Sequence, residues 1–167
     1  KIKTKLIDLS GIDDKLLSVL PTSDKIGQGN LKARLRMLVL YYFANKYNYL
    51  VVGTGNKSEL KMGYFTKFGD GGCDLLPIGD LLKTEVRQLA HELNIPKDII
   101  NKTPSAGLWQ GQTDEAELGV SYSELDKILA GLERSNTRGL SLNKLNKVKA
   151  KIKKTEHKRR PPKVCYL

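Results

Sequence analysis

The residues best placed to do chemistry lie in one glycine-rich stretch, residues 49–74. Thr54 stands in Gly53-Thr54-Gly55, directly after a short apolar run, where a parallel strand would meet its following helix. Its hydroxyl can bond a ligand at the carboxyl edge of a sheet. Glu59 lies about one turn into the expected helix, and a hydroxyl with a carboxylate beside phosphates suits a magnesium nucleotide. The alternative is that Thr54 caps the helix and Glu59 is solvated.

A second group of candidates surrounds a dense glycine segment, Gly69-Asp70-Gly71-Gly72. Such a segment lets the backbone approach a ligand closely, and Lys67 and Asp74 flank it. An ordinary surface hairpin is an equally good interpretation. Lys83 stands at the start of a further expected helix, where helix amides and a lysine together suit a phosphate, although a solvated lysine is the commoner case. The chain contains neither a G-x-x-x-x-G-K-[ST] loop nor a G-x-G-x-x-G fingerprint between strand and helix.

Histidines and cysteines add no further chemistry by their spacing. Neither His91 nor His157 has a second His or Cys nearby, and Cys73 and Cys165 have neither metal-ligand nor disulfide spacing. No G-x-S-x-G or other nucleophile arrangement is present. The residues by themselves therefore indicate an α/β nucleotide-binding domain with a phosphate-binding edge.

The elements that must position these residues follow from the apolar spacing. Residues 31–43 repeat apolar side chains at i, i+4, i+7 and i+8, which predicts an amphipathic helix with Asn30 as N-cap and Arg34 and Arg36 on its polar side. The apolar run at 49–52 predicts a buried strand, and a helix followed by such a strand indicates a parallel sheet. The other expected elements are a turn at 10–14, helices at 15–20, 57–62, 82–93 and 141–154, a strand at 74–78, loops at 22–30 and 96–112, a helix capped by Ser121 or Ser123, and an extended tail at 155–162.

The fold class that follows is α/β, with a Rossmann-like parallel sheet flanked by helices in a single domain over residues 1–167. The net charge of +11 favours an anionic partner, but ten of the 29 Lys and Arg residues lie in residues 141–163 against one acid, Glu156. A nucleic-acid-binding protein ranks last because this basic segment lacks interleaved aromatic residues. No run is apolar enough for a membrane span or a signal peptide, so we expect a cytoplasmic protein.

Blocks along nearly the whole chain resemble the ammonia-dependent NAD synthetases, in the order of that family. They are G-N-L-K-A-R-L-R-M (29–37), G-T-G-N-K-S-E (53–59), F-T-K-F-G-D-G-G-C-D-L-L-P (65–77), Lys83 with Val86-Arg87, P-S-A-G-L (104–108), Q-T-D-E-A-E-L-G (112–119) and E-H-K-R (156–159). Each block alone is weak evidence, whereas the ordered set is highly specific. GMP synthetases and tRNA-thiolating enzymes, the nearest alternatives among ATP pyrophosphatases, lack the 65–77 block and the E-H-K-R tail.

The resemblance implies a Rossmann-like fold of the adenine nucleotide alpha hydrolase type and a two-step reaction. The nicotinate carboxylate of deamido-NAD attacks the α-phosphate of ATP, pyrophosphate leaves, and ammonia then displaces AMP to give NAD. Mg²⁺ offsets charge on the phosphates. Carried over by position, the resemblance implies ATP contacts at Thr54, Lys83 and Ser105, a magnesium ligand at Glu59, a deamido-NAD site at Arg34, Lys67, Asp74, His157 and Lys158, and catalytic roles for Asp74 and Lys83. Residues 104–119 resemble a mobile loop that would keep water from the adenylate.

The resemblance has one clear departure. The family's pyrophosphate-binding S-G-G-x-D-S loop is not found in the 167 residues, and Ser10-Gly11-Ile12-Asp13-Asp14 has only a passing likeness to it. We therefore expect Lys1 to correspond to a point inside the family's chain, and the 167 residues alone to have little synthetase activity. The resemblance also implies a homodimer, and direct use of ammonia is the simplest expectation because no glutaminase domain is present in these residues. A truncated, non-catalytic binding protein is the remaining alternative.

Overall fold

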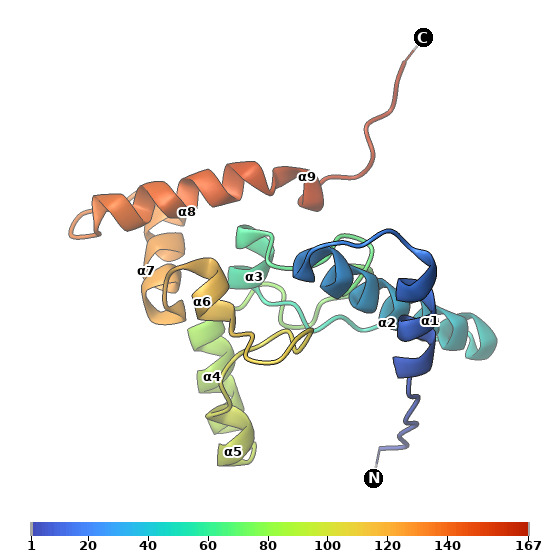
Figure 1. The fold of residues 1–167 in the computed structure, drawn as a ribbon. Coiled ribbons are helices and arrows are strands. Elements are labelled where there is room, and N and C mark those ends of the chain that lie inside the picture. The colour runs from blue at the N-terminus through green and yellow to red at the C-terminus, as the bar shows by residue number, and fades with distance from the viewer. Residues whose placement is uncertain (1, 167) are drawn as a thin grey trace.

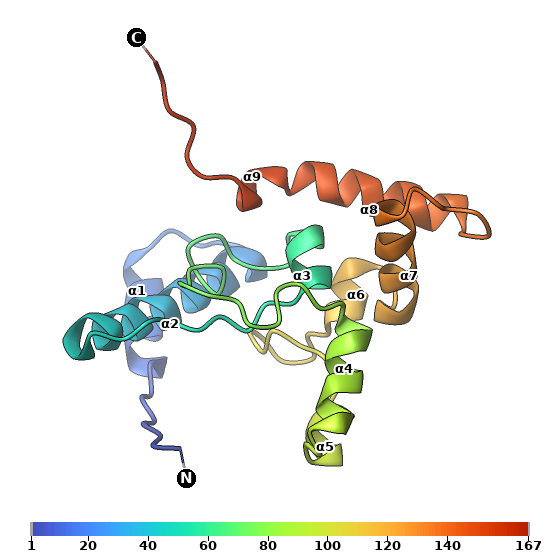
Figure 2. The same cartoon turned by 180° about the vertical axis from the view of Figure 1, so that it is seen from behind.

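The computed structural model describes residues 2–166, and nine helices account for its regular structure over that range (Figure 1). Lys1 and Leu167, the ends of the predicted domain, lie outside the described residues. The helices are α1 (Ser10–Val19), α2 (Lys25–Tyr47), α3 (Lys57–Met62), α4 (Lys83–Glu92), α5 (Lys97–Ile100), α6 (Asp114–Leu118), α7 (Tyr122–Glu133), α8 (Leu142–Lys154) and α9 (Glu156–Arg159). α8 and α9 run along one side of the molecule, with α3 beside them and α1 and α2 at the opposite end from α7 (Figures 1 and 2).

The long helix α2 begins earlier than predicted, because Asp24 and not Asn30 is its N-cap. The Asp24 carboxylate accepts a hydrogen bond from the Gly27 amide at 2.7 Å. Residues 25–30, predicted as part of a loop, are therefore helical. Gly29 is useful inside this helix, since a Cβ there would lie 3.1 Å from side-chain atoms of Leu108 and Trp109. The glycine thus lets the later loop pack directly on α2.

Three other segments differ from the sequence prediction, and one of them is α5, a short helix inside the predicted loop 96–112. α1 starts at Ser10, where a turn was expected, and the Asp8 carboxylate accepts hydrogen bonds from the Ser10 amide at 2.9 Å and hydroxyl at 2.7 Å. These bonds lower the pKa of Asp8. The predicted extended tail is interrupted by α9, because the Thr155 carbonyl accepts the Lys158 amide at 3.0 Å and closes one more turn. The prolines act only after Arg160.

The predicted parallel sheet is not formed among residues 2–166, which contain no strand. The two expected strands instead meet in one parallel bridge between Val52 and Leu75. The Gly53 amide donates to the Leu75 carbonyl and the Asp74 amide to the Val51 carbonyl, both at 2.9 Å. The pairing stops there because the Gly79 amide bonds the carbonyl of residue 76 and turns the chain. The parallel direction of this pair is therefore confirmed, whereas the predicted sheet stays unconfirmed among the described residues.

The largest hydrophobic core lies where α3, α7 and α8 meet. Met62 of α3, Leu125 and Leu129 of α7 and Val148 of α8 are almost fully buried there. The stripe predicted for the helix after Ser121 supplies this core, and Ser121 is confirmed as its cap. The core therefore fixes α3, which carries Glu59, against the basic helix α8.

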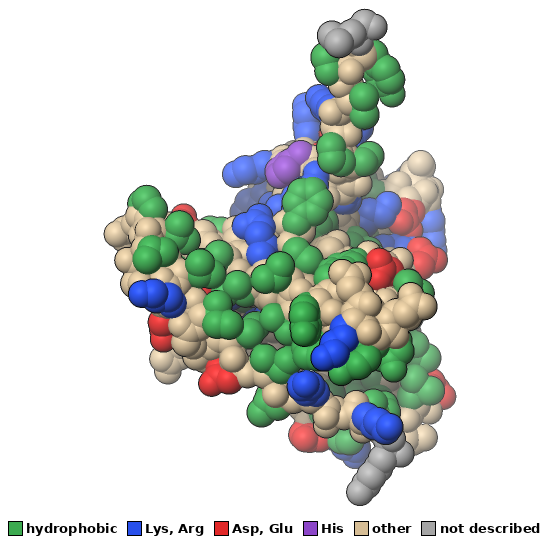
Figure 3. Space-filling model, turned by 90° about the vertical axis from the view of Figure 1, so that its right-hand side faces the viewer, with side chains coloured by type: hydrophobic (Ala, Val, Ile, Leu, Met, Phe, Trp, Pro, Cys, Tyr) green, Lys and Arg blue, Asp and Glu red, His purple; other side chains and the backbone are tan. Residues whose placement is uncertain are grey.

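The opposite end of the molecule keeps apolar side chains on its surface. Leu38, Leu40 and Tyr42 of α2 and Leu50 after it are all more than half exposed, with Leu38 at 63%. Figure 3 shows hydrophobic side chains gathered on this face of the molecule, with basic side chains around them. Within the described residues, no helix has the length and apolar character needed to cross a membrane.

Candidate functional site

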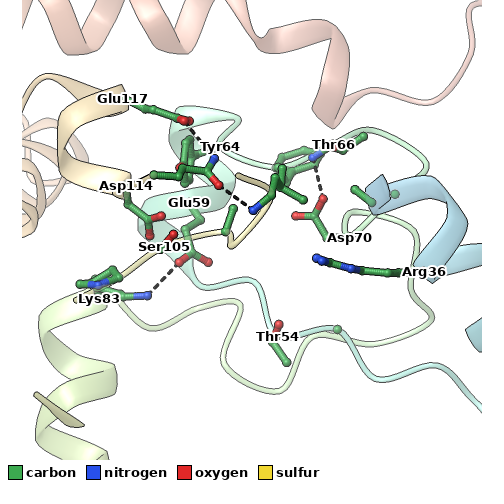
Figure 4. Close-up of a pocket in the computed structure, with 18 of the residues that line it drawn as sticks. Arg36, Thr54, Glu59, Tyr64, Thr66, Asp70, Lys83, Ser105, Asp114 and Glu117 are labelled. Carbon is green, nitrogen blue, oxygen red and sulfur yellow. Dashed lines mark hydrogen bonds and ion pairs between the residues drawn. The ribbon is translucent and has the colours of Figure 1, made fainter. Parts of the chain in front are cut away.

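A cavity of about 880 Å³ lies between α2, α3, the start of α4 and the loop that follows α5 (Figure 4). Of the predicted site residues, Thr54, Glu59, Lys83, Ser105 and Lys158 line it. They come from five separate segments of the chain. The structure thus brings every predicted ATP or magnesium contact, and one predicted deamido-NAD contact, to the same cavity.

Thr54 reaches the cavity because the chain turns at Gly53 directly after the parallel bridge. A Cβ at Gly53 would lie 2.5 Å from the Cys73 Sγ and 2.7 Å from Leu76, closer than real Cβ contacts allow. Glycine therefore permits the two paired segments to approach, and the next residue, Thr54, is left exposed to the cavity. Its hydroxyl caps no helix, because Asn56 is the N-cap of α3.

Glu59 and Lys83 form an ion pair at the cavity wall. Lys83 Nζ lies 2.9 Å from Glu59 Oε1, and both side chains are largely buried. The other carboxylate oxygen of Glu59 accepts the Asn56 amide at 3.1 Å, and Asn56 in turn accepts the Glu59 amide, a reciprocal capping box. Lys83 also lies over the Tyr122 ring, 5.1 Å from its centroid. The solvated alternatives for both residues are therefore wrong.

The amides at the start of α4 are already used by the protein. The Lys83 amide donates to Ser58 Oγ at 2.9 Å, and the Thr84 amide donates to Asp126 Oδ2 at 2.8 Å. The expectation that helix amides and a lysine act together on a phosphate is corrected accordingly. The Lys83 and Thr84 amides are therefore not free to bind a ligand, whereas the Lys83 ammonium faces the cavity.

Glu59 is the one predicted metal ligand, and its surroundings limit what it could hold. No group of three or more His, Cys, Asp or Glu side chains within residues 2–166 could hold a metal ion. Mg²⁺ is commonly held by one or two carboxylates together with waters and substrate phosphates. Glu59 therefore fits magnesium that arrives with a nucleotide, whose phosphates and waters would complete its coordination.

The loop between α5 and α6 covers part of the cavity and is tied to its surroundings. Ser105 Oγ accepts the Gly107 amide at 3.1 Å, and the Asp114 amide donates to the Pro104 carbonyl at 3.0 Å. The Gln112 side chain bridges the loop to α6, because it accepts the amide of residue 108 and donates to Glu117, each at 2.9 Å. Ser105 thus faces the cavity from a loop held at both ends.

Two buried side chains and one partly buried side chain near this wall were missed by the sequence reasoning. Tyr122 donates its hydroxyl to Asp114 Oδ2 at 2.9 Å. Figure 4 shows Tyr64 near Asp114, and both line the cavity. Burial raises the pKa of both tyrosines, and the Asp114 charge adds to it, so both hydroxyls stay protonated. Asp114 is only 4% exposed. Its place in the Q-T-D-E block was the available signal, but no role was assigned to it.

The basic tail returns to the cavity and is fixed there by lysines. Lys158 Nζ donates to the Gly63 and Phe65 carbonyls at 2.8 and 2.7 Å, and burial lowers its pKa. Lys67 Nζ donates to the His157 carbonyl at 2.7 Å and to the Arg160 carbonyl at 2.9 Å. The tail is therefore held in two ways. Its own Lys158 donates to carbonyls outside the tail, and Lys67 donates to carbonyls of the tail.

Four predicted deamido-NAD residues lie outside the cavity lining: Arg34, Lys67, Asp74 and His157. Arg34 donates to the Lys67 carbonyl at 3.3 Å, and Lys67 binds the backbone of His157, so these three are neighbours. Asp74 is apart from them. Its carboxylate accepts the Val51 amide at 2.7 Å and the Tyr41 hydroxyl at 3.0 Å.

The position of Asp74 changes the expectation for its substitution. Asp74→Ala should lower the free energy of unfolding by about 1–2 kcal/mol, because the Val51 amide, at a buried residue, loses its partner. Urea unfolding would measure this loss. Asp80→Ala is the matched control, because the Asp80 side chain is exposed and forms an ion pair with Lys57. Loss of that ion pair should lower the free energy of unfolding by less than about 1 kcal/mol. Equal losses for the two variants would contradict the structural role of Asp74.

Comparison with known proteins agrees with this geometry. The family model described as NAD synthase matches residues 1–162. The NH(3)-dependent NAD(+) synthetase of Methanosarcina acetivorans is 49% identical over 176 residues, covering 99% of this chain and 69% of that protein. Among solved structures, the NMN synthetase of Francisella tularensis matches with a TM-score of 0.87 and 41% sequence identity. The NH3-dependent NAD synthetase of Campylobacter jejuni matches with a TM-score of 0.81 and 30% sequence identity. Each covers 96% of this chain, and 66% and 64% of the other chain.

The chain spans 69% of the length of the Methanosarcina acetivorans protein and 62% of the length of the Sulfolobus acidocaldarius protein. The match to the family model and the high identity extend over nearly all of its residues, including every segment that lines the cavity. Both solved relatives named above are synthetases, and the likeness to each covers 96% of this chain. The chain belongs to the NAD synthase family.

Proposed function

We propose that the protein containing this chain amidates deamido-NAD to NAD, using ATP and ammonia. The observation that carries the proposal is the Glu59–Lys83 ion pair, which faces one cavity together with the hydroxyls of Thr54 and Ser105. A lysine, two hydroxyls and a carboxylate form a set that suits the phosphates of a magnesium nucleotide. The family membership supports the same reaction.

The chain's own residues can be given distinct roles in the first step. The Lys83 ammonium, paired with Glu59 in the free protein, would turn to the phosphates and stabilise charge as pyrophosphate leaves. Glu59 would then be free to hold magnesium, which supplies further charge compensation when it is bound with ATP. Thr54 and Ser105 would orient the nucleotide by hydrogen bonds. The loop that carries Ser105 would exclude water from the adenylated intermediate.

The acid to be amidated is proposed to lie toward the basic tail. Lys158 lines the cavity, and Arg34, Lys67 and His157 lie beside it around the start of the tail. Deamido-NAD carries phosphates and a carboxylate, so cations at this end are complementary to it. Asp74 is retained as a proposed contact on the resemblance alone.

The deciding experiment is incubation of the complete gene product with ATP, magnesium, ammonium and deamido-NAD. The expected result is formation of NAD and AMP in equal amounts, with no product when ammonium is omitted. A protein that hydrolyses ATP without forming NAD, or that forms no AMP, would contradict the proposal. Glutamine in place of ammonium should give no product unless a glutaminase partner is added.

A second candidate substrate is the acid form of nicotinamide mononucleotide. The observation that favours it is the likeness to the NMN synthetase of Francisella tularensis, at a TM-score of 0.87 and 41% identity. The chemistry is the same, and only the size of the acid differs. Comparing kcat/KM for the mononucleotide and the dinucleotide distinguishes the two, and we expect the dinucleotide to be preferred.

We further propose that the protein is a homodimer in the cytoplasm. The exposed apolar side chains of α2, including Leu38, Leu40 and Tyr42, support a second copy at this face. Leu38→Glu should shift the protein from dimer to monomer in sedimentation equilibrium, because it places a charge in that face. Ile99→Glu, an exposed apolar position on α5, is the matched control and should leave the dimer intact. The free cysteines Cys73 and Cys165 are compatible with a reducing compartment.

A further inference from the structure

Two buried polar side chains lie directly behind Lys83. Ser58 of α3 is fully buried and Asp126 of α7 is 3% exposed. Ser58 Oγ donates to Asp126 Oδ1 at 2.5 Å and accepts the Lys83 amide at 2.9 Å, while Asp126 Oδ2 accepts the Thr84 amide at 2.8 Å. Neither side chain lines the cavity. They therefore contact the backbone of the helix end that carries Lys83.

The start of α4 needs these partners because its own sequence caps it only in part, through Glu85, whose carboxylate accepts the Leu82 amide at 2.7 Å. Leu82 occupies the N-cap position and has no side-chain acceptor. The first amides of a helix require acceptors, and a carboxylate there also interacts favourably with the helix dipole. Ser58 and Asp126 supply both from two other helices. The orientation of the first turn of α4 is thus set by α3 and α7.

The consequence for the site follows from the order of residues in α3. Ser58 holds the Lys83 backbone, and the next residue, Glu59, holds the Lys83 ammonium at 2.9 Å. We propose that Ser58 and Asp126 are positioning residues that fix the first turn of α4, so that the Lys83 ammonium is aimed at the phosphates of ATP. This inference rests on the proposed function of the cavity.

The test uses the complete gene product and compares Ser58→Ala and Asp126→Asn with the wild type. Each variant should lower kcat/KM for ATP by about 10- to 100-fold, because a shift near 1 Å in a charged group has effects of that size. The KM for ammonium should change less than about twofold. Ser58→Thr keeps the hydroxyl and should retain most of the wild-type kcat/KM for ATP.

A double-mutant cycle separates positioning from general stability. In a Lys83→Met background, Asp126→Asn and Ser58→Ala should have no further effect on kcat/KM for ATP, because the group they position is gone. If Asp126→Asn or Ser58→Ala lowers kcat/KM for ATP by the same factor in the Lys83→Met background as in the wild type, the inference is overturned. Ile128→Val, a core change in α7 beside Asp126, is the stability control and should leave the KM for ATP unchanged.

The outcomes distinguish this inference from the proposed function. A wild-type protein that makes no NAD contradicts both. A wild-type protein that makes NAD, with variants whose activity falls only in proportion to their folded fraction by circular dichroism, contradicts the positioning role alone. If Asp126→Asn does not fold, the Ser58→Ala and Ser58→Thr pair gives the same decision by itself.

Discussion

Lys83→Met should lower kcat/KM for ATP by about two to three orders of magnitude in the complete gene product, with a much smaller effect on the KM for ammonium. The reason is that Lys83 is the one cation whose ammonium is held at Glu59 in the cavity, and the amides behind it are occupied by Ser58 and Asp126. Removing one well-placed donor to developing negative charge has effects of this size. Steady-state production of AMP measures it.

Lys57→Met is the matched control for that variant. Lys57 also lies near Glu59 in the sequence of α3, but its ammonium pairs with Asp80 at 2.9 Å and Glu133 at 3.8 Å, away from the cavity lining. We expect less than about a twofold change in activity. A Lys83→Met protein with wild-type turnover, or a Lys57→Met protein with an equal loss, would remove Lys83 from the site.

Stability should also separate the two lysine variants. Lys83→Met leaves the Glu59 carboxylate with one hydrogen bond and no cation, at a largely buried place. The free energy of unfolding should fall by about 1–3 kcal/mol. Lys57→Met removes pairs that include the exposed Asp80, which should cost less than about 1 kcal/mol. The loss of activity in Lys83→Met at a temperature far below unfolding is then chemical.

The sequence locates most helices of this chain, whereas its predicted sheet is represented by a single bridge among the described residues, for a physical reason. A helix is held by bonds within its own segment, so apolar spacing and a capping serine, Ser121 or Ser123, are enough to predict α7. A strand exists only when a neighbour pairs with it. Among the described residues the run at 49–52 finds one parallel partner, in a single bridge, and its outward side chains such as Leu50 stay exposed.

The candidate site divides in the same way. Thr54, Glu59 and Lys83 could be anticipated because each follows a local signal, a glycine turn or a helix start. Asp126 could not, because its partners Ser58 and Thr84 are 68 and 42 residues away and no local pattern marks it. Tertiary contacts also supply the acceptors for the Lys83 and Thr84 amides at the start of α4. Local signals thus locate the reacting groups, and long-range contacts determine how they are held.

Gly63→Ala should be the most destabilising small substitution near the site. Gly63 ends α3 with φ of +62°, a conformation that costs a non-glycine residue about 1 kcal/mol or more. A Cβ there would also lie 2.4 Å from the Cβ of buried Thr155, which cannot turn away because it is bonded directly to the backbone. Overpacking of this kind adds about 1–3 kcal/mol, so we expect a total loss of about 3 kcal/mol. Urea unfolding with an unchanged slope would measure it.

Gly119→Ala isolates the backbone part of that loss. Gly119 ends α6 with φ of +69°, but nothing lies within 4 Å of a Cβ at this position. Its substitution should therefore cost only about 1 kcal/mol. The difference between the variants measures how tightly α3 packs on the turn before α9. Because the Gly63 carbonyl also accepts Lys158 Nζ at 2.8 Å, amides of α9 should exchange hydrogen faster in Gly63→Ala and not in Gly119→Ala. Equal losses of stability would show that the contact with Thr155 can relax, and that the tail is not held rigidly against the cavity.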